Sequence, residues 1–324
     1  MPVIHGRKDA LKVLERALER NVPVPILGTG SFWNIEAILI AAKNIKEKYQ
    51  IAEMPVTISM TYTYPCMPQA KRITACSVPE LGFRSIMTQI RTLVESSESP
   101  YRGITVLPHL DHADPERDIW ALTEGTQYLA SAMFDAQRFP AEKNAELTAE
   151  YVKAYGGKIL VEGIMDELAV EAMHDKNVQS ISDEEYPERA AQYVKRTGID
   201  FLVADLGTEQ QAAGTSKCHY MPERARAITA AVGRPMLTMH GGSSLPPEQL
   251  AQLGMDGVIR FNVWTKIARD AGKLAAFQLF KRAEQIAEND FEATESAAYM
   301  RDNVQGAVKS MEAIFEHLGY SRLA

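Results

Sequence analysis

The chain has 324 residues, of which 46% are hydrophobic and 24% charged, and its formal net charge is −7. This composition indicates a globular fold with a large core, and the negative charge argues against binding to nucleic acid or to an anionic membrane. Three cysteines without a repeated spacing, no long apolar segment and an N-terminus interrupted by charges argue against a disulfide framework, a membrane helix and a signal peptide. We therefore expect a cytoplasmic protein.

Short β-rich runs alternate with longer amphipathic stretches along the whole chain. The expected strands are residues 24–27, 56–60, 104–107, 128–133, 158–161, 201–204, 236–239 and 258–261. The expected helices between them include residues 35–49, 79–94, 141–155, 187–196, 222–232 and 247–253, several of which begin with proline. This alternation is typical of a parallel sheet whose strands are connected by helices.

The number of strands favours a closed barrel. Eight strands each followed by a helix, an extra helix over residues 8–19 and further helices after Trp264 predict one (β/α)8 TIM barrel domain over residues 1–324. The alternative is an open doubly wound sheet, which usually has a glycine-rich phosphate loop after its first strand. Residues 28–31 (GTGS) match that loop only in part. Residues 60–78 are expected to form a long polar loop that could act as a lid over the barrel.

Polar side chains occur at the carboxyl ends of the expected strands, where barrels of this kind carry their catalytic groups. In chain order these residues are Ser59, His109, Asp111, His112, Asp135, Glu162, Asp205, Gln210, His240, Gly241, Gly242, Ser243 and Asn262. We expect them to converge on one mouth of the barrel. Imidazole and carboxylate groups from separate strands can form an open site for a divalent metal ion, with His112 and His240 as the leading pair of ligands.

Six segments extend this pattern over nearly the whole chain. They are LPHLDHA (107–113), SAMFDAQRFPAEKN (131–144), LVEG (160–163), RTGIDFLVADLGT (196–208), PMLTMHGGSS (235–244) and FNVWT (261–265). Each segment alone is weakly specific. In this order and with these spacings, the chain resembles the class II, metal-dependent ketose-phosphate (fructose-bisphosphate) aldolases, as a divergent member.

The resemblance implies a role for individual residues. His112 and His240 ligate a divalent ion, Zn²⁺ in the first place, and Glu162 is a further acidic residue at the metal. Asp111 is the acid/base that exchanges a proton with the hydroxyl group at the bond to be cleaved. The implied substrate contacts are Ser59, Asp135, Gly241, Gly242, Ser243, Asn262, Trp264 and Thr265.

The resemblance also implies an activity and an assembly. The activity is a carbon–carbon lyase reaction, the reversible aldol cleavage of a ketose phosphate or related anionic sugar through a metal-bound enediolate. The assembly is a homodimer or a homotetramer.

The chain departs from the family pattern at two important positions. Gln210 stands where the family has its remaining histidine ligand. Because an amide oxygen is a weaker and harder ligand than imidazole, the site is expected to bind metal less tightly, to favour Mn²⁺ or Mg²⁺, or to recruit Glu209 or His219. Trp264 stands where an asparagine or aspartate usually contacts the substrate, and it could offer an apolar or stacking face there.

Three alternatives remain open from the sequence. The same metal site could return the proton without bond cleavage, which would make the protein an epimerase or isomerase. The chain could also be a non-catalytic, aldolase-like partner subunit, although a scaffold has no need to keep Asp111, His112 and His240. Finally, Tyr62 and Tyr64 could either cover the mouth of the barrel or pack against neighbouring helices.

Overall fold

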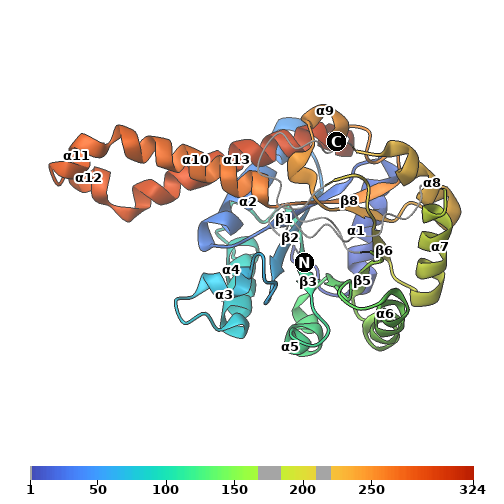
Figure 1. Cartoon of the computed structure of the whole chain (residues 1–324). Coiled ribbons are helices and arrows are strands. Elements are labelled where there is room, and N and C mark those ends of the chain that lie inside the picture. The colour runs from blue at the N-terminus through green and yellow to red at the C-terminus, as the bar shows by residue number, and fades with distance from the viewer. Residues whose placement is uncertain (1, 167–183, 209–219) are drawn as a thin grey trace.

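The computed structural model describes residues 2–166, 184–208 and 220–324. Its strands form a closed barrel in which each strand is parallel to the next and β8 pairs back with β1 (Figure 1). The strands are β1 (Val24–Gly28), β2 (Met54–Thr61), β3 (Ile104–Ala113), β4 (Ser131–Phe134), β5 (Leu160–Ile164), β6 (Phe201–Val203), β7 (Leu237–Met239) and β8 (Val258–Val263). The predicted (β/α)8 barrel is therefore confirmed.

The helices surround the barrel, and their bounds agree with the amphipathic stretches to within a few residues. The longer helices are α1 (Arg7–Glu19), α2 (Phe32–Tyr49), α4 (Pro79–Glu95), α6 (Ala141–Tyr155), α7 (Tyr186–Thr197), α8 (Pro222–Val232), α10 (Thr265–Lys281) and α13 (Ser296–His317). The short helices are α3 (Gln69–Ile73), α5 (Ile119–Leu122), α9 (Pro247–Leu250), α11 (Ala283–Ala287) and α12 (Phe291–Thr294). None of the described helices has the length and apolar character needed to cross a membrane.

The C-terminal helices extend beyond the barrel. Figure 1 shows α10 leaving the barrel, α11 and α12 forming the tip of an arm, and α13 returning alongside α10. At its barrel end α13 packs against α2, which anchors the arm.

The barrel interior is apolar at one end and polar at the other. At the amino-terminal ends of the strands, α1 packs Val13 and Leu14 into a cluster that includes Leu107 and Phe201. Toward the carboxyl ends, the strands instead bury charged and hydrogen-bonding side chains such as Glu162. The apolar core thus closes the amino-terminal end of the barrel, and buried polar side chains lie toward the carboxyl-terminal end.

Two differences from the expected elements concern the open end of the barrel. The segment His109 to His112 was expected to follow the third strand, but β3 continues through it to Ala113. The segment 60–78 is not wholly a loop, because α3 lies within it. Gln69 holds α3 to the end of β2: its Oε1 accepts a hydrogen bond from the Thr61 N–H (3.0 Å), and its own N–H donates to Thr61 Oγ1 (2.9 Å).

Gly82 allows α4 to pack closely against α3. A Cβ atom at this position would lie 1.8 Å from the backbone oxygen of Ala70. We expect Gly82→Ala to lower the free energy of unfolding by about 1–3 kcal/mol, because the two helices must move apart. Denaturant unfolding measures this change. As a control, we use Gly272→Ala in α10, where an added Cβ atom would meet no described atom within 4 Å apart from its chain neighbours and its own helix backbone. This substitution should be neutral or slightly stabilising, so equal losses in both variants would contradict the packing argument.

Candidate active site

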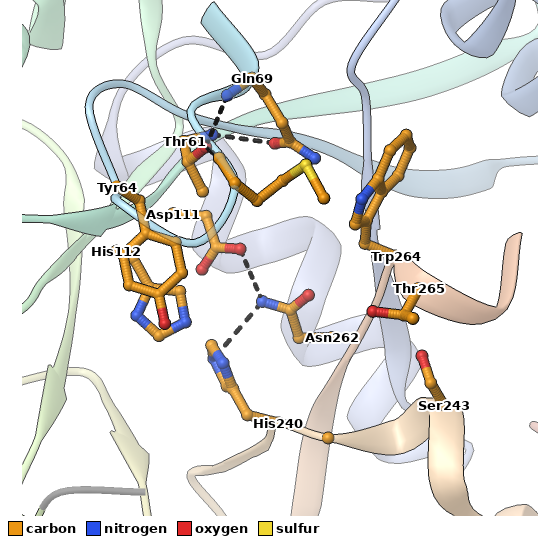
Figure 2. Close-up of a pocket in the computed structure, with 12 residues that line it drawn as sticks. Thr61, Tyr64, Gln69, Asp111, His112, His240, Ser243, Asn262, Trp264 and Thr265 are labelled. Carbon is orange, nitrogen blue, oxygen red and sulfur yellow. Dashed lines mark hydrogen bonds between the residues drawn. The ribbon is translucent and has the colours of Figure 1, made fainter. Parts of the chain in front are cut away.

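The carboxyl ends of the strands surround a cavity of about 70 Å³ (Figure 2). Three parts of the chain line it. The end of β2 and the segment after it contribute Thr61, Tyr64, Met67 and Gln69; β3 contributes Asp111 and His112; and the ends of β7 and β8 contribute His240, Gly241, Ser243, Asn262, Trp264 and Thr265. Six of the residues predicted to converge on one mouth line this cavity: Asp111, His112, His240, Gly241, Ser243 and Asn262. Trp264 and Thr265, which the resemblance gave as substrate contacts, line it as well.

An irregularity in β3 turns two adjacent side chains toward this cavity. In a regular strand, successive side chains point to opposite faces. Here the register of β3 against β4 shifts between Leu110 and Ala113, and His112 has a φ of 47°, in the left-handed region. Such a bulge redirects side chains, and non-glycine residues with positive φ concentrate at functional sites. Both Asp111 and His112 consequently line the cavity.

His112 and His240, with Asp111 close beside them, form a candidate metal site. One potential ligand atom from each of these buried residues lies within 4.8 Å of the other two. Asn262 Nδ2 donates to Asp111 Oδ2 at 2.9 Å, whereas the buried Oδ1 has no partner among the described residues. Burial raises the pKa of Asp111, but the nearby imidazoles, His112 first, lower it by more, so its carboxylate is ionised at neutral pH.

Each of the two histidines is paired with a buried carboxylate. His112 Nδ1 lies 2.7 Å from Asp135 Oδ2, and His240 Nε2 lies 3.3 Å from Glu162 Oε1. Burial lowers the pKa of His112, but the Asp111 and Asp135 carboxylates outweigh burial and raise it to about 9. A site that stabilises positive charge in this way is favourable for a cation. Carboxylate partners of this kind are typical of histidines that bind metals.

Beneath this cluster lies a buried ion pair that the sequence analysis missed. Arg260 Nη1 donates to Glu162 Oε2 at 2.8 Å, and Thr238 Oγ1 donates to the same oxygen at 2.7 Å. Burial raises the pKa of Glu162, but the positive charge of Arg260 outweighs it and holds the pKa well below its usual range. The sequence contained one signal of this pair: Arg260 is a charged residue within the otherwise apolar expected strand 258–261, two positions before Asn262.

The two tyrosines of the 60–78 segment have different environments. Tyr62 is buried, stacks on Trp120 and packs edge-on against Phe83, so it belongs to the helical packing. Tyr64 instead stacks on His112, with ring centroids 4.3 Å apart, and it lines the cavity. Of the two possibilities left open by the sequence, packing against helices applies to Tyr62, and a position at the mouth of the barrel applies to Tyr64.

The remaining predicted residues lie elsewhere. Ser59 is fully buried within β2 and Asp135 is buried behind His112, and neither lines the cavity. Gly242 lies next to the cavity-lining Gly241 but itself borders a separate small apolar pocket. Gln210, like the alternative ligands Glu209 and His219, lies outside the described residues.

Comparison with known proteins supports the same reading of the chain. The sequence profile of the family described as fructose-bisphosphate aldolase class-II matches residues 8–321. The chain belongs to this family. The match includes all six segments named above, and the cavity-lining Asp111, His112 and His240 lie within two of them.

Curated relatives of the aldolase family are similar over part of their length. The chain is 31% identical to a fructose-bisphosphate aldolase of Streptococcus pyogenes over 188 residues, which is 57% of this chain and 60% of the relative. It is 30% identical to a fructose-bisphosphate aldolase of Giardia intestinalis over 181 residues, or 54% of each chain. The match therefore spans less than two thirds of these relatives.

Solved structures of aldolases share the fold. The crystal structure of a fructose-bisphosphate aldolase from Campylobacter jejuni has a TM-score of 0.73 and 19% identity, and the alignment covers 98% of this chain and 95% of that one. The YdjI aldolase from Escherichia coli has a TM-score of 0.63 and 18% identity, with 94% of both chains covered. At these identities, the likeness establishes the barrel alone.

Proposed function

We propose that the protein is a metal-dependent lyase that reversibly cleaves a carbon–carbon bond of a ketose phosphate or a related anionic sugar. The observation that carries the proposal is the buried Oδ1 of Asp111, which lies in a cluster with two histidines and has no partner among the residues that the structure describes. An ionised carboxylate in that position can act as a general base, and membership of the class II aldolase family supports the reaction type.

The donor set fits a divalent ion. Because Asp135 occupies the Nδ1 side of His112 and Glu162 the Nε2 side of His240, each imidazole keeps its other nitrogen for a metal. A divalent ion bound there would polarise the ketose carbonyl and stabilise negative charge on its oxygen. Zn²⁺ is the ion expected from the resemblance, and Mn²⁺ or Mg²⁺ is the alternative if the amide of Gln210 completes the site.

Asp111 performs the proton transfer in this proposal. Its carboxylate takes the proton from the hydroxyl group at the bond to be cleaved, and the O–H electron pair forms the carbonyl of the aldehyde product. The carbon–carbon bond then breaks, and its electron pair stays on the other fragment as an enediolate. In the reverse direction Asp111 returns the proton. Asn262 holds the carboxylate in place through its 2.9 Å hydrogen bond.

The other predicted residues would bind the phosphate group of the substrate or position a metal ligand. We propose that Gly241, Ser243 and Thr265 hold the phosphate group at the first turn of α10, where backbone N–H groups favour an anion. The Lys266 N–H donates to Ser243 Oγ at 3.0 Å and so joins the two segments. Glu162, whose two oxygens contact His240, Thr238 and Arg260, acts through His240 in this scheme.

Addition of metal to the chelator-treated protein tests the site. Zn²⁺ at 100 times its Kd should stabilise the fold by about 2.7 kcal/mol, seen as a rise in Tm, because the ion binds the folded state only. His240→Ala should abolish this rise. His5→Ala, which changes a histidine bonded to the Tyr128 carbonyl before β4, should retain it. No stabilisation of the unmodified protein by any of the three ions would favour the non-catalytic partner subunit.

Product analysis by NMR tests the reaction, with fructose 1,6-bisphosphate and fructose 1-phosphate as probes. An aldolase yields two smaller carbonyl compounds, which supports the proposal. An epimerase or isomerase yields a single sugar phosphate of unchanged carbon number, which would replace aldol cleavage by proton return at the same site.

We also propose that the protein forms a homodimer or homotetramer in the cytoplasm. Besides the family resemblance, exposed aromatic side chains on the arm support self-association: Phe277, Phe280 and Phe291 are 58%, 79% and 76% exposed. Light scattering of the purified protein would reveal a monomer if the proposal is wrong.

A further inference from the structure

Trp264 forms one wall of the cavity and is fitted to the end of β1. A Cβ atom at Gly28 would lie 3.0 Å from the Trp264 Cβ, and one at Gly30 would lie 3.2 Å from its Cζ2. These distances are shorter than ordinary van der Waals contact, so the two glycines leave the space that the indole occupies. The bulky residue at the end of β8 is therefore packed into the barrel mouth and is not a loosely held surface substitution.

The indole nitrogen of Trp264 is a hydrogen-bond donor that has no acceptor in the described part of the chain. Nε1 is buried and has no partner among the described residues. Figure 2 shows this nitrogen on the edge of the ring that faces the other lining side chains. Because a buried N–H normally finds an acceptor, its position indicates a ligand oxygen in the cavity.

The described residues that form the wall around this donor are uncharged. Gln69, Met67 and Thr61 are the neighbouring contributors from β2 and the segment after it, and no lysine or arginine is among the described residues that line the cavity. A phosphate dianion is normally bound by cationic side chains or by several converging N–H groups. One indole N–H beside an amide and a thioether instead matches a hydroxyl or carbonyl oxygen.

We propose that Trp264 is a specificity-determining residue that donates its indole N–H to an uncharged substrate oxygen and closes the cavity against a second phosphate. The inference rests on the proposed function and narrows its substrate class to ketose monophosphates. The single phosphate is placed at Ser243 and Thr265, and the end of the sugar that faces Trp264 carries hydroxyl groups only.

Two substitutions distinguish the two proposed roles of Trp264, as a hydrogen-bond donor and as a wall that limits the cavity. Trp264→Phe keeps most of the ring volume but removes the N–H, and it should lower kcat/KM for fructose 1-phosphate about tenfold. Trp264→Asn removes the wall as well, and it should raise the ratio of kcat/KM for fructose 1,6-bisphosphate over fructose 1-phosphate at least about tenfold. Trp33→Phe on α2 is the matched control and should change neither value. Ratios within twofold of the unmodified protein in both variants would overturn the inference.

A binding measurement keeps this test independent of turnover. In protein labelled with 5-fluorotryptophan, the ¹⁹F resonance that disappears in Trp264→Phe belongs to Trp264. It should shift on titration with fructose 1-phosphate and stay unchanged with inorganic phosphate. A shift without cleavage would refute only the proposed reaction, whereas cleavage or binding with an unmoved resonance would refute only the role of Trp264. Failure of fructose 1-phosphate to bind at all would overturn the inference.

Discussion

Asp111→Asn is expected to lower kcat for the proposed cleavage by about 100- to 10,000-fold, the usual contribution of a positioned general base. Asparagine has nearly the same shape and can still contact Asn262, but it cannot accept a proton at neutral pH. The histidines that line the cavity with it are unchanged, so the metal content of the purified protein should remain close to that of the unmodified protein. Steady-state kinetics and elemental analysis measure the two quantities.

The matched control for this substitution is Glu116→Gln, which removes an exposed carboxylate from the segment after β3. The Glu116 side chain is 67% exposed and pairs with Arg138 at the surface, so turnover should not change. Full turnover of Asp111→Asn would remove Asp111 from the mechanism. A parallel loss of metal and turnover would instead make this carboxylate a ligand of the ion.

Arg260→Met is expected to lower the free energy of unfolding by about 3–5 kcal/mol. Arg260 and Glu162 are 1% and 0% exposed, so removal of the guanidinium leaves a carboxylate buried without its countercharge. Methionine fills much of the volume, which makes the lost charge the main change. Denaturant unfolding of the metal-free protein measures the effect without a contribution from metal binding.

Two further variants test the cause of this loss. Arg16→Met breaks the exposed ion pair between Arg16 and Glu53 and should cost no more than about 1 kcal/mol. The double variant Glu162→Gln with Arg260→Met removes both charges and should recover a large part of the stability lost by Arg260→Met. If the double variant were as unstable as the single one, packing around Arg260, including its contact with Phe201, would be the cause instead.

The residues changed by these two substitutions lie in two layers of the site, one facing the cavity and one beneath it. Asp111, His112 and His240 face the cavity, and Asp135 and Glu162 hold the histidines from behind. Arg260 then neutralises Glu162 inside the barrel. Because the lower layer is fully buried, we expect substitutions in it to lower mainly the free energy of unfolding. Substitutions in the upper layer should lower mainly the rate of the proposed reaction.

The sequence by itself determined the barrel and most of its mouth. Strand and helix patterns are local, since a β-rich run or an amphipathic stretch is visible within about ten to fifteen residues. In a parallel barrel, all strands also end on the same face, so the order of strands along the chain was enough to bring Asp111, His240 and Asn262 together. The expected reaction class came instead from the resemblance of the six segments to the class II aldolases.

Only the tertiary structure decided how these side chains are oriented and supported. The bulge that turns His112 beside Asp111 depends on the pairing of β3 with β4, and Glu162 and Arg260 pair across 98 residues of sequence. The fit of Trp264 against Gly28 likewise joins the last strand to the first. Such contacts leave no periodic signal in the chain, because they depend on which side chains meet across the closed barrel and not on their neighbours in sequence.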